Sequence, residues 1–160
     1  MPLGNYANKK PFESSISSAK RYFGWLLARR EYAEAELLQK AKQKGYTPEH
    51  IAEAMAFMQK HGLQDDARYA GMKSRSAAHR YGDRKIEHLL KSKKVAPDII
   101  VAQVQELAPE EDRAWNAIDR HAGEPLTAEL NAKLWRRLAS KGFGSAAIKA
   151  AIRRLRDESA

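Results

Sequence analysis

The residues best suited to chemistry lie between His79 and Val95. The sequence there reads HRYGDRKIEHLLKSKKV and contains six lysines and arginines against two acids. Ammonium and guanidinium groups form charge-assisted hydrogen bonds with phosphate oxygens, so this composition favours the binding of a polyanion. Arg84 and Lys91 are seven residues apart and, at about 100° per helical residue, lie within roughly 20° of each other. Both point away from Ile86, which we expect in the core, so the segment predicts a cationic helix face.

A second cationic face is predicted near the end of the sequence. Lys149, Arg153 and Arg156 repeat with the i, i+4, i+7 spacing of one helix face. The alternative is that both faces are ordinary solvated surfaces, although charges of one sign repel one another unless a polyanion is bound. The residues that we expect to bind DNA or a nucleoprotein filament are Arg68, Lys73, Arg75, Arg80, Arg84, Lys85, Lys91, Lys93, Lys94, Lys149, Arg153 and Arg156.

Catalytic and metal-binding patterns are not found in the sequence. The five histidines are His50, His61, His79, His88 and His121. They form no i, i+4 pair and no H-E-x-x-H motif, and the absence of cysteine excludes thiolate nucleophiles and cysteine-based zinc sites. The GFG at 142–144 lacks the lysine of a phosphate loop, and no serine lies in a G-x-S-x-G motif. We therefore expect a binding protein with no enzymatic activity, no cofactor and no metal.

The composition narrows the possible partners. The 160 residues carry a net charge of +9, with 31% charged and 8% aromatic residues, which is typical of a helix-rich protein that binds a polyanion. No apolar run approaches the roughly 20 residues of a membrane span. The opening MPLGNYANKKPFESSISS lacks the apolar centre of a secretory signal. We expect a cytoplasmic protein whose first 14 residues form a flexible arm.

The charge is unevenly distributed along the chain. Residues 67–97 have a net charge of +7, residues 98–112 of −5, and residues 22–66 of only −1. The acidic segment 98–112, which ends in PEED, has two interpretations. It contacts a basic protein patch, or its acids simply match the dipole at a helix start.

An internal repeat indicates how these faces are positioned. The chain aligns with itself at a spacing of 48 to 49 residues. The aligned residues are Leu37, Ala41, Gly45, Tyr46, Ile51, Met55 and Met58 in the first copy; Ile86, Leu90, Lys94, Val95, Ile100, Val104 and Leu107 in the second; and Leu134, Leu138, Gly142, Phe143, Ile148, Ile152 and Leu155 in the third. Six columns are apolar, and the Gly–Lys–Gly column marks a helix C-terminus, where a left-handed residue is favoured.

Each copy has the helical spacing of a three-helix unit, with Thr47, Thr127 and Ser145 as expected N-caps. A unit of this size buries little surface alone, so neighbouring units must stack. We predict an all-α fold, a tandem array of three trihelical repeats that is elongated and curved. The expected divisions are the arm at 1–14 and repeats at 15–66, 67–108 and 109–160.

Aromatic side chains are the remaining candidates for nucleic-acid contact. Tyr69, Tyr81, Trp115 and Trp135 are candidates for stacking on bases, with core packing as the favoured alternative for Tyr81. Tyr46 and Phe143 share a repeat column with Val95 and are expected in the core.

Five segments form a distinctive combination: WLLARREYAEAELLQKAKQKGY (25–46), GLQDDARYA (62–70), SRSAAHRYGDRKIEHLLKSKKV (74–95), RHAGEPLT (120–127) and LWRRLASKGFGSAAI (134–148). Together they resemble the RecX family, bacterial regulators of the RecA recombinase. The resemblance covers about residues 22–155. Lys94 stands where the family has glycine and Ala33 where it has a capping serine, which affects only the local cap geometry.

The resemblance implies a protein that binds in the groove of the RecA filament on single-stranded DNA. It further implies inhibition of RecA ATP hydrolysis, strand exchange and coprotease activity, and hence a role in recombination, DNA repair and control of the SOS response. A monomer is expected, with binding to double-stranded DNA left open. The alternatives are a freestanding DNA-binding helical-repeat protein acting without RecA, and a pure protein-interaction scaffold.

Overall fold

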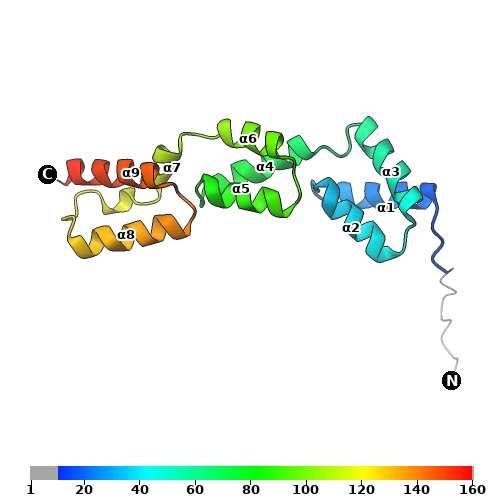
Figure 1. Ribbon diagram of the computed structural model, residues 1–160, viewed down its shortest axis with the longest axis horizontal. Coiled ribbons are helices and arrows are strands. Elements are labelled where there is room, and N and C mark those ends of the chain that lie inside the picture. Colours follow the sequence, from blue (N-terminus) through cyan, green and yellow to red (C-terminus); the bar gives the residue numbers. More distant parts are fainter. Residues whose placement is uncertain (1–10, 160) are drawn as a thin grey trace, which may run out of the picture. The chain divides into compact units, whose positions relative to one another are not determined.

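The structure, a computed structural model, describes residues 11–159, so most of the expected flexible arm lies outside the described residues. Within 11–159 every regular element is helical, which confirms the all-α prediction (Figure 1). The elements are α1 (Ile16–Leu27), α2 (Glu34–Lys44), α3 (Pro48–Lys60), α4 (Asp66–Ala78), α5 (Asp83–Ser92), α6 (Pro97–Gln105), α7 (Glu110–Asn116), the 3-10 turn η1 (Asp119–His121), α8 (Ala128–Ser140) and α9 (Ser145–Glu158).

The helices begin largely where polar caps predict. The Thr47 hydroxyl accepts a hydrogen bond from the His50 N–H at 3.4 Å, and the Thr127 hydroxyl accepts one from the Leu130 N–H at 3.1 Å. The prediction for Ser145 is wrong by one residue, because Gly144 is the N-cap of α9. A glycine has no side chain to cap the helix, and its own N–H donates to the carboxylate of Glu110, from elsewhere in the fold.

The Gly–Lys–Gly column ends a helix in each copy, as predicted. Gly45, Lys94 and Gly142 all have left-handed backbones, with φ of 99°, 56° and 84°. This conformation costs a residue with a side chain roughly 1–2 kcal/mol, so Lys94 is the strained member. The next residue closes each end with an N–H bond of 3.2 Å to a carbonyl oxygen, from Tyr46 to Ala41, from Val95 to Leu90, and from Phe143 to Leu138.

The described chain forms two compact units, the first ending at Gln64 and the second beginning at Asp65. The first unit contains α1–α3 around one apolar core, in which α1 packs on α3. The second contains α4–α6 and α7–α9, and the last three helices share a core of their own. The domain boundaries expected from the sequence stay a prediction.

Burial at equivalent repeat positions differs between the two halves of the second unit. Ile86 and Leu90 of α5 are fully buried, like their counterparts in the other copies. Val104 and Leu107 are only half-buried, whereas the matching Ile152 and Leu155 are buried. The middle copy therefore buries less apolar surface at these two columns than the third copy does.

Candidate nucleic-acid interface

The first element of the candidate interface is a line of basic residues on α5. Arg84 and Lys91 are exposed, and His88 lies between them at the i+4 position, also exposed. Ile86 and Leu90 on the opposite side are 1% and 0% exposed, so the cations stand clear of the core. We call Arg84, His88 and Lys91 the α5 stripe; the sequence analysis assigned no role to His88 here.

The second element is on α9, which we call the α9 stripe. Its three members, Lys149, Arg153 and Arg156, are all exposed. Ile148 and Leu155 of the same helix are buried. The helix therefore presents one apolar and one cationic face, as its spacing predicts.

The remaining candidate cations divide by exposure. Arg68, Arg75, Arg80 and Lys94 are exposed, and Arg68 and Arg75 share a face because they are seven residues apart. Lys73, Lys85 and Lys93 are half-buried. Neighbouring residues therefore cover part of these three side chains, which makes them weaker candidates for phosphate contact than the cations of the two stripes.

The stripes carry unneutralised charge. In the part of the chain that the structure describes, Arg84, Lys91 and the three cations of the α9 stripe form no ion pair. Arg154, on another side of α9, differs: it pairs with Glu158 at 3.3 Å and lies 4.3 Å from the centre of the Trp115 ring. The stripes thus remain available to an anionic partner, whereas Arg154 is engaged within the fold.

A shared carboxylate joins the starts of the two helices that carry the stripes. Glu110 Oε1 accepts the N–H of Asp83, the first residue of α5, at 2.8 Å, and the N–H of Gly144, the N-cap of α9, at 3.1 Å. A carboxylate is well matched to the positive end of a helix dipole, and here it serves two helices. Of the two interpretations of segment 98–112, Glu110 therefore follows the helix-start one. The other acids of the segment, Asp98, Glu106, Glu111 and Asp112, are exposed.

A buried arginine completes this junction. The side chain of Arg113 is 7% exposed and forms an ion pair with Asp83. Its Nε donates to the Ala108 carbonyl and its Nη1 to the Tyr81 carbonyl, both at 2.9 Å. The guanidinium fork thus ties two loops to the start of α5. Arg113 was not predicted as a functional residue, because no local sequence pattern reveals that distant carbonyl groups meet there.

Two glycines bring the main chains together at the same place. The Gly82 N–H donates to the Lys141 carbonyl at 3.0 Å, and the Arg84 N–H donates to the Gly142 carbonyl at 3.2 Å. A Cβ at position 82 would lie 2.4 Å from the backbone of Phe143, and one at position 142 would lie 2.5 Å from the Cβ of Lys85. The direction of α5 is therefore set by backbone contact.

Further cations gather beside this junction. Partial burial lowers the pKa of the Lys141 ammonium, and the positive charges of Arg137, Arg80 and Arg120 lower it further. Crowded cations of this kind create a positive potential that a phosphate would relieve. Arg80 was among the predicted site residues, whereas Arg120, Arg137 and Lys141 were not. Arg80 and Lys141 are 61 residues apart in the sequence, and the fold brings the four cations together.

The four aromatic residues that were candidates for base stacking are buried or half-buried. Tyr69 is 1% exposed and Trp115 is 8% exposed, so neither face is open to a base. Tyr81 is half-buried near Arg80 and Lys85, and Trp135 is half-buried against the core of α7–α9. The most exposed aromatic side chain between residues 11 and 159 is Trp25 on α1, at 55%, which the sequence analysis did not consider.

Other site types find little support in the described residues. In residues 11–159, no group of three or more histidine and acidic side chains is placed to share a metal ion. Over the same range, no helix combines the length and apolar character needed to cross a membrane.

Comparisons with known proteins give a consistent result. A family model described as "RecX, first three-helix domain" matches residues 19–58, and one described as "RecX, second three-helix domain" matches residues 65–102. "Regulatory protein RecX" of Pasteurella multocida is 32% identical over 79% of this chain and 81% of its own length. "Regulatory protein RecX" of Vibrio campbellii is 36% identical over 68% of each chain. The crystal structure of RecX from Lactobacillus salivarius covers 88% of this chain and 96% of its own, with a TM-score of 0.80; at 18% identity, this likeness shows the fold.

Proposed function

Because the chain belongs to the RecX family of regulatory proteins, we propose that it binds the RecA filament on single-stranded DNA and inhibits RecA. The activities inhibited are ATP hydrolysis, strand exchange and coprotease activity. The protein acts by binding rather than by catalysis, in the bacterial cytoplasm, and as a monomer.

The observation that carries this proposal is the unneutralised charge of the α5 and α9 stripes. Exposed cations that have no carboxylate partner gain most when they meet phosphates, since each contact releases counterions from the nucleic acid. The twelve cations predicted from the sequence are the proposed contact set, and the five in the two stripes are its strongest members.

The junction holds together the starts of the two helices that carry the stripes. The N-termini of α5 and α9 meet at one oxygen of Glu110, and Arg113 fixes the start of α5. A helix start held by such contacts loses little backbone freedom on binding, which favours affinity. A preorganised surface suits a repeating polyanion such as a filament.

The test is RecA-dependent ATP hydrolysis on single-stranded DNA, titrated with the protein at two salt concentrations. We expect inhibition that weakens as salt rises. The double variant Arg84→Glu with Lys91→Glu should inhibit at least tenfold less while keeping its helical circular dichroism. The matched control is Lys42→Glu with Lys60→Glu, which changes the net charge equally on exposed residues of the first unit. Undiminished inhibition by the α5 variant would contradict the proposal.

The same assay and a pull-down separate the alternatives. A freestanding DNA-binding protein, for which three-helix units are a common framework, would bind bare DNA as tightly as the filament. A pure protein-interaction scaffold would bind its target with an affinity that salt barely changes. Preference for the assembled filament together with salt dependence is the expected result.

A further inference from the structure

The first unit has an exposed face that the proposed function does not use. On α1, Ala19, Phe23 and Leu26 are buried against the unit's core. Another side of α1 carries Tyr22 and the exposed Trp25, three residues apart and therefore neighbours on the helix surface. An indole that is 55% exposed keeps much of its apolar surface in water, which is unfavourable unless a partner covers it.

The rings on this face are arranged as a stacking platform. Tyr22 and Trp25 have ring centroids 6.3 Å apart, and their planes differ by 18°. Tyr46 continues the series, with its centroid 5.7 Å from that of Tyr22 and the planes 25° apart. Tyr46 is buried and supports Tyr22 from the core, so the accessible rings are those of Tyr22 and Trp25, on whose faces planar, aromatic ligands can stack.

Cations surround these rings. The Lys44 ammonium is 4.7 Å from the centroid of Tyr22, and the Arg29 guanidinium is 3.4 Å from that of Trp25. Arg21 is exposed beside them. None of the three forms an ion pair within residues 11–159, and the sequence from 14 to 30 contains no acid. The face is therefore positive as well as aromatic.

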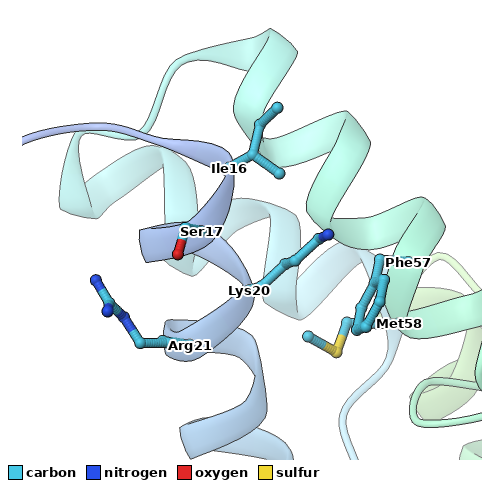
Figure 2. Close-up of a pocket in the computed structure, with 6 residues that line it drawn as sticks. All are labelled: Ile16, Ser17, Lys20, Arg21, Phe57 and Met58. Atoms are coloured by element: carbon cyan, nitrogen blue, oxygen red, sulfur yellow. The ribbon is translucent and has the colours of Figure 1, made fainter.

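A hollow of about 320 Å³ opens among these side chains. It is lined by Ser18, Arg21, Tyr22, Trp25, Lys44 and Tyr46. A second hollow, of about 540 Å³, lies on the other side of α1 (Figure 2). There Lys20 extends toward Phe57 of α3, 4.1 Å from the ring centroid, whereas Arg21 points away. The second hollow is lined by one aromatic ring, that of Phe57, whereas the first is lined by three, which makes the second the poorer site for a stacked ligand.

We propose that the hollow beside Tyr22 and Trp25 binds an unpaired base of a single-stranded nucleic acid. The base stacks on the two rings and Arg21 contacts a flanking phosphate, while Arg29 and Lys44, which lie over Trp25 and Tyr22, add positive charge to the site. A duplex keeps its bases stacked on one another and leaves the indole uncovered, whereas an apolar protein surface would bury the cations without partners. A single strand supplies both aromatic faces and negative charge. This inference shares with the proposed function only the class of ligand, because the hollow lies in the first unit and the two stripes lie in the second.

The first test uses the tryptophan fluorescence of the protein, and the contribution of Trp25 is the difference from Trp25→Phe, which keeps Trp115 and Trp135. Three probes with equal numbers of phosphates are compared: an oligothymidylate, an abasic strand and a hairpin duplex. We expect the oligothymidylate alone to quench the emission strongly, and the quenching to disappear in Trp25→Phe. Equal quenching by the abasic strand, or quenching that persists in Trp25→Phe, would overturn the proposal.

The second test measures affinity. Trp25→Ala should bind the oligothymidylate about tenfold more weakly and the abasic strand unchanged, since only the stacking contribution is lost. Val101→Ala removes an equally exposed apolar side chain from the second unit and should have no effect. Equal losses for both strands in Trp25→Ala, or no loss for either, would reject the base site. Weakened binding to DNA-free RecA would reject it too, by making a protein the occupant.

The two proposals fail separately. Reversal of the α5 stripe should weaken binding to both strands, because the abasic strand retains its phosphates. If it weakens neither, the proposed function is contradicted, while the difference between the strands still decides the base site.

Discussion

The two compact units use their cations in different ways. In the first unit, cations lie over aromatic rings: Lys20 over Phe57, Arg29 over Trp25, Arg30 over Tyr32 and Lys44 over Tyr22, at 3.4 to 4.7 Å from the ring centroids. In the second unit, the cations of the α5 and α9 stripes lie over no ring and form no ion pair within residues 11–159. A cation on a ring already has part of its attraction satisfied, whereas one in a stripe depends on solvent or a partner.

This contrast shows that net charge alone does not locate a binding surface. Residues 22–66 have a net charge of −1, yet α1 and the residues that follow it contain four cations and no acid from 14 to 30. The range 22–66 leaves out Lys20 and Arg21, although both belong to the first unit. The environment of each cation distinguishes the units better than the sum does.

The largest expected effect is the loss of stability when the buried arginine at the junction of the second unit is replaced. Arg113→Met removes the only buried guanidinium that the described residues contain and leaves Asp83 and two carbonyl oxygens without their donor. Loss of one partner of a buried ion pair costs about 3–5 kcal/mol. We expect a large fall in the free energy of urea unfolding. The control Arg154→Met, at an exposed pair, should cost less than about 1 kcal/mol; equal costs for the two variants would show that the junction is unimportant.

A smaller effect sharpens the contrast between the two kinds of cation. Lys20→Gln removes a charge from the ring of Phe57 and should cost about 0.5–1 kcal/mol. Lys149→Gln removes an exposed stripe cation and should leave stability unchanged while weakening DNA binding. Chemical denaturation and a DNA titration of both variants provide the measurement. The opposite pattern, with Lys149 stabilising and Lys20 neutral, would reverse the distinction between the units.

The smallest expected effect concerns Lys141. Because its pKa is lowered in the fold, the protonated form is disfavoured there, and this cost to stability disappears as pH rises through the lowered pKa. Lys141→Gln removes the cost, so at neutral pH and low salt its melting temperature should equal or slightly exceed that of the unaltered protein. DNA binding should nevertheless weaken. A lower melting temperature would mean that the ammonium group stabilises the fold.

Periodicity along the sequence predicted much of this architecture. The buried columns, the left-handed Gly–Lys–Gly positions and the exposure of both stripes follow from helical spacing, because each depends on residues within one or two turns. Lys85 shows the limit. It follows Arg84 in the cationic segment, but the turn at Gly142 packs on its backbone and leaves it half-buried. Such contacts join residues far apart in the chain, and no local pattern encodes them.

Trp25 illustrates a different kind of omission. Its neighbourhood with Tyr22 on α1 could have been found from the i, i+3 spacing. Its exposure could not, because apolar residues on a helix are normally assigned to the core. Only the packing of α1 on α3 shows which side of the helix remains outside.

The contact between Gly82 and Gly142 has a consequence for how this protein can change over time. Two main chains meet there with no side chain between them, so the angle at which α5 leaves the turn does not depend on the identity of surface residues. Lysines and arginines can be exchanged, added or lost along the exposed face of α5 without tilting the helix. Selection can therefore change the affinity for an anionic partner one cation at a time, while the two glycines keep the orientation of α5 constant.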